Sequence, residues 1–292
     1  MKKTRVLLIG CLLLFCLFSF FFPPGASEEI NNQTLYVGGN GAGNYTQIQD
    51  ALDNVTIGGS VYVFQGIYQE NLRVTTPVHL IGEDPNNTII DGKNETYVVS
   101  LEAGDSTLSG FTITHSKQQF PFAGVYIISN YNTVSNNILT NNFYGMQLGY
   151  SSQYNHITNN TIHHNGRCGI YFNHASYNTL RGNIVYDQPV NGFGLYEFSN
   201  NNQILQNTFT DNRDTGVNIR ESYDNLIANN TFLQERVALH KPAPEYHTIE
   251  QGNLFTDNVV SFEEERDAFV VTVIVFDVSV FIVFLVFRKL VR

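Results

Sequence analysis

Apolar residues in the middle of the chain come in pairs, such as Val134 with Leu139, and asparagine or glycine lies between the two members. These pairs are too short for a helix face, which needs apolar positions repeated every 3.6 residues or so over several turns. The pattern returns at spacings of 23, 23, 24 and 23 residues, and the units begin at Asn132, Asn155, Asn178, Asn202 and Asn225. Three short strands and three turns fit into such a unit, so the repeat predicts an all-β fold, a right-handed parallel β-helix.

The repeat places residues of one kind in columns along the stack of coils. The column five residues after each unit start is asparagine throughout, and it contains Asn137, Asn160, Asn183, Asn207 and Asn230. Strands of adjacent coils lie about 4.8 Å apart, so we expect these asparagines to form amide ladders along the turns. Asparagine also tolerates the left-handed backbone conformation that such turns need.

The N-terminal side of the repeat region predicts a cap and less regular coils. Apolar positions with helical spacing predict a short amphipathic helix that covers the open end of the first coil, namely Ile48, Ala51, Leu52 and Val55. Thr46 and Gln49 have the spacing of a capping box. Strands of the first coils are predicted at 61–64, 78–81 and 98–101.

The C-terminal side of the repeat region is also irregular. A degenerate unit begins at His247, and residues 233–246, which contain two prolines, predict a loop between the last two units. We therefore expect the β-helix domain to span residues 34–258.

Both ends of the chain are strongly apolar. Three basic residues precede an apolar run over 6–22, which predicts a secretory signal peptide at residues 1–27; an uncleaved anchor is the alternative. Residues 268–287 are almost entirely Val, Ile, Phe and Leu, which predicts a transmembrane helix with a cytoplasmic tail at 288–292. Residues 259–267 would then be a juxtamembrane linker. These segments predict a single-pass protein of the cell membrane with an extracellular β-helix domain.

Charge and cysteine content exclude two classes of protein. The 292 residues include 26 acidic and 16 basic residues, for a net charge of −10, and residues 27–267 alone carry 25 acidic and 10 basic ones. Without a basic stripe we expect no nucleic-acid partner. Two of the three cysteines lie in the leader, so Cys168 alone remains and a disulfide-stapled scaffold is excluded.

Two stretches near the start of the domain, Tyr45-Thr-Gln-Ile-Gln-Asp-Ala-Leu and Thr88-Ile-Ile-Asp-Gly, resemble the opening of pectin-lyase-like β-helix proteins, as do residues 61–71 and 80–84. The asparagine-rich units resemble the NosD-type repeats of secreted and surface proteins, which include periplasmic copper-processing factors. The resemblance covers about residues 34–258 and implies a parallel β-helix. It leaves the activity open, because such β-helices include lyases, hydrolases, epimerases, adhesins and inert scaffolds.

Stacking brings residues with reactive side chains into two further columns. The first column lies nine residues after the unit starts and contains Asn141, His164, Asp187 and Asp211. The second lies nineteen residues after the unit starts and contains Ser151, His174, Glu197 and Glu221, provided that the extra residue of the third unit follows Phe198. Carboxylates about 5 Å apart perturb each other's pKa, as in glycoside hydrolysis. His164, Asp187 and Asp211 are therefore the candidate catalytic residues; the alternative is that they are solvent-facing turn residues that happen to align.

The resemblance implies no particular catalytic motif here. The adjacent aspartate pair with His-Gly of polygalacturonase-like enzymes and the Asp-Pro-His-Asp run of alginate epimerases are both missing, and the arginines share no column. The acidic exterior repels polyuronates unless Ca²⁺ bridges them, but it does not exclude neutral glycans. For copper, His163, His164 and His174 are near neighbours, yet there are only two methionines to supply soft ligands. We predict no metal site and no cofactor; Ca²⁺ and copper are the alternatives.

Tyr131, Tyr154 and Tyr177 each precede a unit start and should stack as a column. They are candidate glycan-binding residues; a packing ladder that stabilises the turn is the alternative. Seven sequons predict glycosylation at Asn32, Asn44, Asn54, Asn86, Asn94, Asn159 and Asn229.

Taken together, these features predict a membrane-anchored, non-catalytic scaffold at the cell surface, with a polysaccharide or an envelope protein as its partner. A polysaccharide hydrolase, lyase or epimerase is the first alternative function. Metal handling of the NosD kind is the second.

Overall fold

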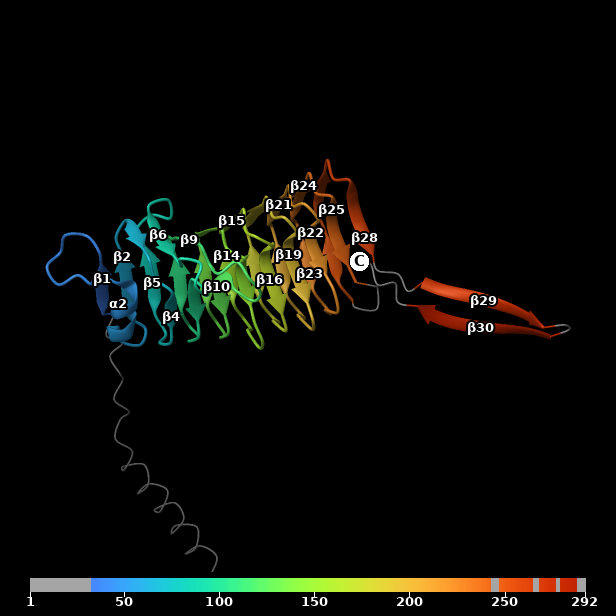
Figure 1. Cartoon of the computed structure of the whole chain (residues 1–292), viewed down its shortest axis with the longest axis horizontal. Helices are drawn as coiled ribbons and strands as arrows, with labels where there is room; N and C mark the ends of the chain where they lie inside the picture. The colour runs from blue at the N-terminus through green and yellow to red at the C-terminus, as the bar shows by residue number, and fades with distance from the viewer. Residues whose placement is uncertain (1–32, 243–246, 265–267, 277–278, 288–292) are drawn as a thin grey trace, which may run out of the picture. The chain divides into compact units, whose positions relative to one another are not determined.

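The computed structural model describes residues 33–242, 247–264, 268–276 and 279–287. Over residues 33–242 and 247–264 the chain winds through coils of a right-handed parallel β-helix. Each coil contributes one strand to each of three sheets, and the first strand, β1, is a tenth strand of one sheet beside the nine strands of each of the others (Figure 1). The predicted fold class is confirmed for this part of the chain.

We name the sheets A, B and C in the order in which each coil passes through them. Sheet A contains β1 (Thr34–Val37), β2 (Ser60–Val63), β5 (His79–Gly82), β8 (Thr107–Ser109), β11 (Thr133–Ser135), β14 (His156–Thr158), β17 (Thr179–Arg181), β20 (Gln203–Leu205), β23 (Leu226–Ala228) and β26 (Ile249–Gln251). Sheet B contains β3 (Gly66–Tyr68), β6 (Thr88–Asp91), β9 (Thr112–Thr114), β12 (Ile138–Thr140), β15 (Thr161–His163), β18 (Ile184–Tyr186), β21 (Thr208–Thr210), β24 (Thr231–Leu233) and β27 (Leu254–Thr256). Sheet C contains β4 (Leu72–Val74), β7 (Val99–Leu101), β10 (Ala123–Ile127), β13 (Tyr144–Leu148), β16 (Cys168–Asn173), β19 (Asn191–Tyr196), β22 (Thr215–Ile219), β25 (Val237–Lys241) and β28 (Val260–Glu264).

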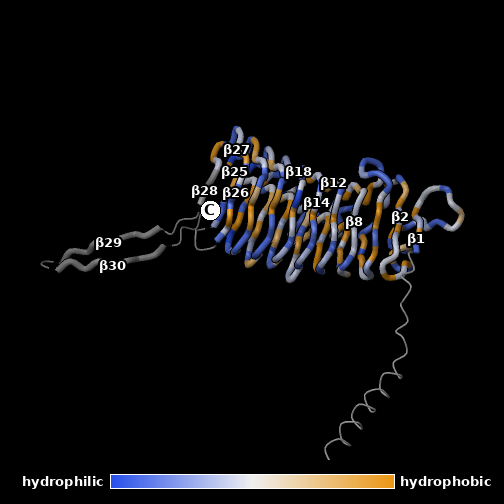
Figure 2. The backbone as a smooth tube through the Cα atoms, turned by 180° about the vertical axis from the view of Figure 1, so that it is seen from behind, coloured by the Kyte–Doolittle hydropathy of each residue, from blue (hydrophilic) through white to orange (hydrophobic). Residues whose placement is uncertain are grey.

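The apolar columns of the repeat form the core of the stack. Val134 pairs with Ile157 and Ile157 with Leu180 in sheet A, and all three side chains are fully buried. Hydrophobic and hydrophilic residues alternate along the coils, as expected for strands with one buried face (Figure 2). Each buried aliphatic side chain contributes about 1.5–3 kcal/mol relative to exposure, so the core supplies most of the stabilisation.

Amide ladders run inside the stack at all three turns of the coil. In the second ladder, Asn160 Nδ2 donates to Asn183 Oδ1 at 3.0 Å and to the carbonyl of Val134 at 2.9 Å, and Asn183 repeats this with Asn207 and Ile157. The predicted ladders are confirmed. The left-handed conformation, however, belongs to the residue before each ladder asparagine, for example Asn136 with φ 55°, and not to the ladder residue itself. The physical reason is that a ladder side chain must point into the core, so its neighbour turns the chain.

The predicted N-terminal helix is present as α2 (Ile48–Asn54), which packs on β1, β2 and β4 at one end of the stack (Figure 1). The predicted capping box is wrong, because the N-cap residue is Gln47 and its side chain makes no capping hydrogen bond. Instead the Glu70 carboxylate accepts hydrogen bonds from the backbone N–H groups of Ile48 and Gln49, at 2.8 and 2.9 Å. A negative charge at this end also suits the helix dipole.

The C-terminal part of the β-helix is more regular than the sequence predicts. Residues 233–246, predicted as a loop, contain the strand β25, whose residues pair with β22 because Val237 and Leu239 continue the apolar pattern of sheet C. The β-helix also continues beyond residue 258, since β28 pairs with β25 inside the predicted linker.

Residues 268–287, predicted as a transmembrane helix, are two strands in the structure. β29 (Ala268–Phe276) and β30 (Ser279–Phe287) pair in antiparallel fashion, and the physical reason is that Val, Ile and Phe favour strands. No helix among the described residues is both long and apolar enough to cross a membrane. The predicted signal peptide (1–27) and tail (288–292) lie outside the described residues.

Candidate functional site: a groove on sheet C

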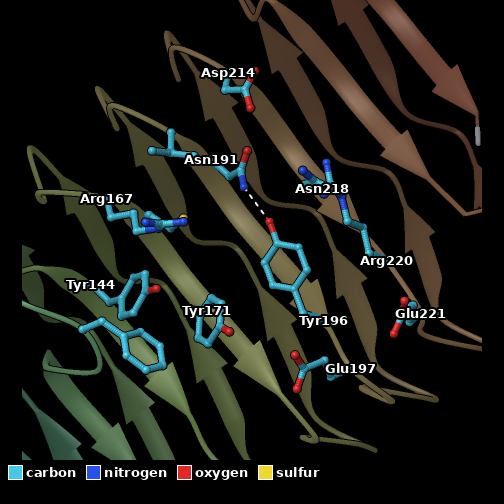
Figure 3. A pocket seen from close by; sticks show the side chains of 13 residues that line it. Tyr144, Arg167, Tyr171, Asn191, Tyr196, Glu197, Asp214, Asn218, Arg220 and Glu221 are labelled. Carbon is cyan, nitrogen blue, oxygen red and sulfur yellow. Dashed lines mark hydrogen bonds between the residues drawn. The ribbon is translucent and has the colours of Figure 1, made fainter. Parts of the chain in front are cut away.

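The outer face of sheet C carries a groove with a volume of about 500 Å³ (Figure 3). Side chains from four successive coils line it, together with Phe120 from a loop. The lining residues are Phe120, Tyr144, Arg167, Cys168, Tyr171, Val190, Asn191, Tyr196, Glu197, Asp214, Asn218, Arg220 and Glu221. Most of them lie on β13, β16, β19 and β22 or within two residues of these strands.

A glycine in the outward-facing column of sheet C makes room for the groove. Along this column Tyr171 pairs with Gly194, and Gly194 pairs with Asn218. Gly194 has no side chain, and the ring of Tyr196 lies where a Cβ at position 194 would be. Asn191 Nδ2 donates to the Tyr196 hydroxyl at 2.7 Å, so the ring is held across the hollow (Figure 3).

Tyrosine rings form the aromatic side of the groove. Tyr144 stacks on Tyr171 at 4.7 Å between ring centroids and 9° between ring planes, and Tyr196 follows Tyr171 at 5.4 Å. Burial is the main cause that raises the pKa of all three phenols, and it raises the pKa of the Cys168 thiol to about 11. These groups are therefore neutral at physiological pH and offer apolar surface with hydroxyl groups at its edge.

Two buried acceptors in the groove lack a hydrogen-bond partner. Asn191 Oδ1 and Asn218 Oδ1 are both inaccessible and accept no hydrogen bond within the described chain. Leaving a buried polar atom without a hydrogen bond costs about 1–3 kcal/mol of folding free energy. A donor from water or from a ligand would remove this cost. The groove thus fits a molecule that carries several hydroxyl groups.

Charged groups of both signs surround the groove. Arg167 and Arg220 form no ion pair with any residue that the structure describes, so their guanidinium groups are available as donors. On the acidic side, Asp214 is paired with Arg236 outside the groove, whereas Glu197 and Glu221 follow the strands at its rim (Figure 3). The groove therefore offers both donors and acceptors and has no strong single-sign field.

The predicted catalytic residues lie elsewhere, on the turn between sheets B and C. His164, Asp187 and Asp211 all have left-handed backbone conformation, and His164 Nε2 lies 3.6 Å from Asp187 Oδ2. Asp187 and Asp211 line a separate shallow hollow that also includes Asp257 and Arg213. The predicted stacking is thus present, but none of these three residues lines the tyrosine groove among the described side chains.

The second predicted column does reach the groove. Glu197 and Glu221 line it, and His174 lies beside Glu197, with 3.7 Å between Nδ1 and Oε2. The extra residue of this coil falls within the pair Glu197–Phe198, because His174 N–H of the preceding coil donates to the Glu197 carbonyl while Phe198 N–H donates to the Glu221 carbonyl of the following coil.

Tyr131, Tyr154 and Tyr177 stack as predicted. Their centroids are 5.2 and 5.4 Å apart, with planes tilted by 7° and 20°. Each ring covers a face of its neighbour, so the column offers solvent mainly ring edges and hydroxyls. This geometry favours the packing ladder over a platform for sugar rings.

Most predicted glycosylation sites are exposed. The asparagines at 54, 86, 94, 159 and 229 are exposed, and Asn44 is half-buried because its Nδ2 donates to the carbonyl of Gly38 at 2.6 Å. Asn32 lies outside the described residues. Their glycosylation stays a prediction.

A copper site does not assemble from the donors that the structure describes. His163 and His164 bring their Nδ1 atoms to 2.7 Å, but Met146 is buried in the core and Cys168 is a buried, protonated thiol on sheet C. The described residues contain no group of three or more His, Cys, Asp or Glu side chains that could hold a metal ion.

Sequence reasoning missed most of the groove. Arg167 and Arg220 lie in different columns, yet side chains of their length reach the same hollow from its two sides (Figure 3). Gly194 was one available signal, because its neighbours on either side in the column, Gln147, Tyr171 and Asn218, all have polar side chains that point outward.

Comparison with solved structures finds the same fold at low sequence identity. An alginate lyase from Paenibacillus sp. matches with a TM-score of 0.58 and 11% identity, covering 74% of this chain and 94% of that one. A pectin methylesterase from carrot matches with a TM-score of 0.57 and 11% identity, covering 79% of this chain and 87% of that one. A pectate lyase matches with a TM-score of 0.52 and 13% identity, covering 81% of this chain and 80% of that one. At such identities the likeness concerns the fold alone.

No curated protein sequence matches the chain. A family model does: that of NosD, described as periplasmic copper-binding protein, matches residues 52–271. This range contains nearly all of the β-helix and its asparagine-rich repeats, which agrees with the resemblance seen in the sequence. The chain belongs to the NosD family.

Proposed function

We propose that this protein binds a glycan chain in the sheet C groove and acts as a non-catalytic, membrane-anchored scaffold at the cell surface. The observation that carries the proposal is the pairing of an aromatic floor with buried acceptors that lack partners. Sugars combine apolar C–H faces with hydroxyl donors, and binding sites for such ligands combine apolar walls with a few placed polar groups.

Each part of the groove has a complementary part in a sugar. The exposed edges of the Tyr171 and Tyr196 rings would contact the C–H groups, and hydroxyl groups would form hydrogen bonds with the Asn191 and Asn218 side chains where these line the groove. The guanidinium of Arg220 would donate to hydroxyl or ring oxygens. Because arginines and glutamates both line the groove, a neutral or weakly charged glycan fits it better than a dense polyanion.

Proteins of the same fold support a carbohydrate partner. The similar solved structures include lyases named for alginate and pectate and an α-1,3-glucanase in complex with nigerose. The membrane anchor and the extracellular location rest on the apolar run at residues 6–22, because residues 268–287 form the strand pair β29 and β30 and not the predicted helix.

A carbohydrate-active enzyme is the second candidate function. The contact between His164 and Asp187 favours it, since a histidine beside a carboxylate can serve as a general base. Against it, these residues lie apart from the tyrosine groove.

Binding of the full-length protein to a panel of neutral and acidic polysaccharides tests the proposal. We expect Tyr171→Ala and Arg220→Ala each to weaken binding by roughly 10- to 100-fold, as for truncated contact residues at binding sites. Tyr177→Ala, which removes an exposed tyrosine of the ladder, is the matched control and should leave binding unchanged. An equal loss of glycan affinity in all three variants would contradict binding in the sheet C groove.

The same mixtures test for catalysis. If the wild type produces new reducing ends or unsaturated sugars and Asp187→Asn does not, the non-catalytic function is refuted and the enzymatic function is supported. The absence of products during stable binding is the expected result.

A further inference from the structure

One coil of the β-helix contains a residue that its neighbours lack. The unit that begins at Asn178 has 24 residues where the two before it have 23. The extra residue falls within the pair Glu197–Phe198. The Glu197 carbonyl accepts from His174 N–H of the preceding coil at 3.0 Å, Phe198 N–H donates to the Glu221 carbonyl of the following coil at 2.8 Å, and Ser199 Oγ accepts from Ala175 N–H at 3.2 Å.

This extra residue is unfavourable for the fold by itself. Glu197 and Phe198 are two consecutive left-handed residues, with φ 49° and 60°, and the Phe198 side chain is 54% exposed. A side chain with a Cβ is strained in this conformation, and an aromatic ring in solvent forgoes burial. Extra residues that break a strand register are concentrated next to functional sites, where they aim a side chain.

Phe198 is one of three rings that gather on the turns after sheet C. Its ring centroid lies 5.7 Å from that of His174, with a tilt of 47°, and His174 in turn stacks on Tyr150 at 4.5 Å. Tyr150 is 72% exposed, so the cluster presents aromatic surface to solvent. His174 Nδ1 is held 2.6 Å from Asn173 Oδ1, which fixes the central ring.

The three-ring cluster begins where the groove ends. Glu197 lines the groove, and the next residue in the chain is Phe198. Phe198 N–H donates at 2.8 Å to the carbonyl of Glu221, which also lines the groove. A ligand that leaves the groove over this rim therefore meets the three rings next.

We propose that Phe198, His174 and Tyr150 form an outer subsite that holds a sugar ring of the same glycan chain whose neighbouring units occupy the groove. The proposal rests on the proposed function and deepens it. The ligand is then an oligosaccharide several units long, and a single sugar or a disaccharide fills the groove without reaching the outer rings. The rings contact the C–H face of the sugar, and the Glu197 and Asn173 side chains beside them offer polar partners.

Affinity as a function of ligand length tests the outer subsite. The full-length protein and Phe198→Ala are titrated with laminari-, cello-, xylo- and chito-oligosaccharides, from disaccharide to octasaccharide. For the series that binds, we expect Phe198→Ala to weaken octasaccharide binding by about fivefold and to leave disaccharide binding unchanged, because one aromatic contact is worth roughly 1 kcal/mol. Ile67→Ala, which removes an exposed apolar side chain on sheet B, is the control and should change neither.

Phe198→Gly separates binding from folding. Glycine adopts the left-handed conformation without strain, so this variant should unfold at the same or a higher Tm than the wild type while it loses the octasaccharide advantage. A lowered Tm in Phe198→Gly would show that the ring stabilises the turn and would overturn the proposal. An unchanged octasaccharide affinity in both variants, or an equal loss at every length, would overturn it as well.

The outcomes also distinguish this proposal from the function on which it rests. Wild-type binding that responds to Tyr171→Ala but not to Phe198→Ala would refute the outer subsite and leave the groove intact. If no oligosaccharide or polysaccharide of the panels binds the wild type, both proposals fail.

Discussion

Glu235 is the one acidic residue inside the third amide ladder among the described coils, and its replacement by glutamine is the sharpest test of the ladder. The Glu235 side chain is fully buried, Asn212 Nδ2 donates to its Oε1 at 2.7 Å, and its Oε2 accepts no hydrogen bond. Two coils earlier in the same ladder, Gln188 Nε2 donates to the carbonyls of Ile162 and Tyr186, at 3.0 and 2.8 Å. A carboxylate oxygen in the place of that amino group would face carbonyl oxygens, so the protonated acid is favoured.

The magnitude follows from the pKa of Glu235. Burial is the main cause that raises this pKa from 4.5 to about 8, the Asn212 hydrogen bonds lower it, and the charge of Asp211 raises it further. At about 1.36 kcal/mol per pKa unit, the folded state is destabilised by about 3 kcal/mol at pH 7 and by about 5 kcal/mol well above pH 8. The sign is set by proton uptake: the folded state holds the proton between pH 4.5 and 8 and the unfolded state does not, so stability falls as pH rises through this window.

Glu235→Gln removes the ionisation and restores a donor. We expect the variant to match the wild type within about 1 kcal/mol below pH 4.5, to exceed it by about 3 kcal/mol at pH 7, and to lose the dependence on pH that belongs to this group. Urea unfolding of both proteins between pH 4 and 9 measures the difference, provided that m is unchanged. Glu95→Gln, at an exposed position, is the control and should follow the wild type. Parallel curves for the wild type and Glu235→Gln over this range would refute the reasoning.

Three further substitutions test the fold. Asn183→Ala leaves the carbonyl of Ile157 without its donor, so we expect a loss of about 3 kcal/mol in urea unfolding, and a loss below about 1 kcal/mol would contradict the ladder. Gly192→Ala would place a methyl group 2.7 Å from the carbonyl oxygen of Gly216 and should lower Tm far more than Gly66→Ala, whose methyl group would come no nearer than 3.3 Å to the Tyr68 ring. Glu70→Ala should cost about 1 kcal/mol in urea unfolding by uncapping α2, and an unchanged stability would contradict the cap.

The repeat made the β-helix predictable because its evidence is internal to the chain. The 23-residue period and the asparagine columns recur in unit after unit, so chance agreement at one position matters little. Local rules failed where a distant residue supplied the interaction, as at α2, where Glu70 replaced the expected cap. They also failed at residues 268–287, where apolar character alone does not distinguish a strand from a helix.

At the candidate site, too, the repeat predicted some features and the three-dimensional neighbours decided the others. Stacking arithmetic placed Glu197 and Glu221 in one column, and both line the groove. It could not find the groove itself, because the hollow depends on a missing side chain at Gly194, the tilt of the Tyr196 ring and the reach of Arg167 and Arg220 from opposite sides. None of these has a signature in the spacing of residues.

The sequence by itself determined the number of residues per coil, the inward apolar columns and the amide ladders, since a repeated unit must stack on its own copy with backbone groups and side chains in register. The tertiary structure alone decided which surface is hollow, which acceptors are left without partners and which carboxyl is kept protonated. The physical reason is that burial and side-chain reach depend on neighbours in three dimensions, and a period along the chain specifies only which residues lie above one another.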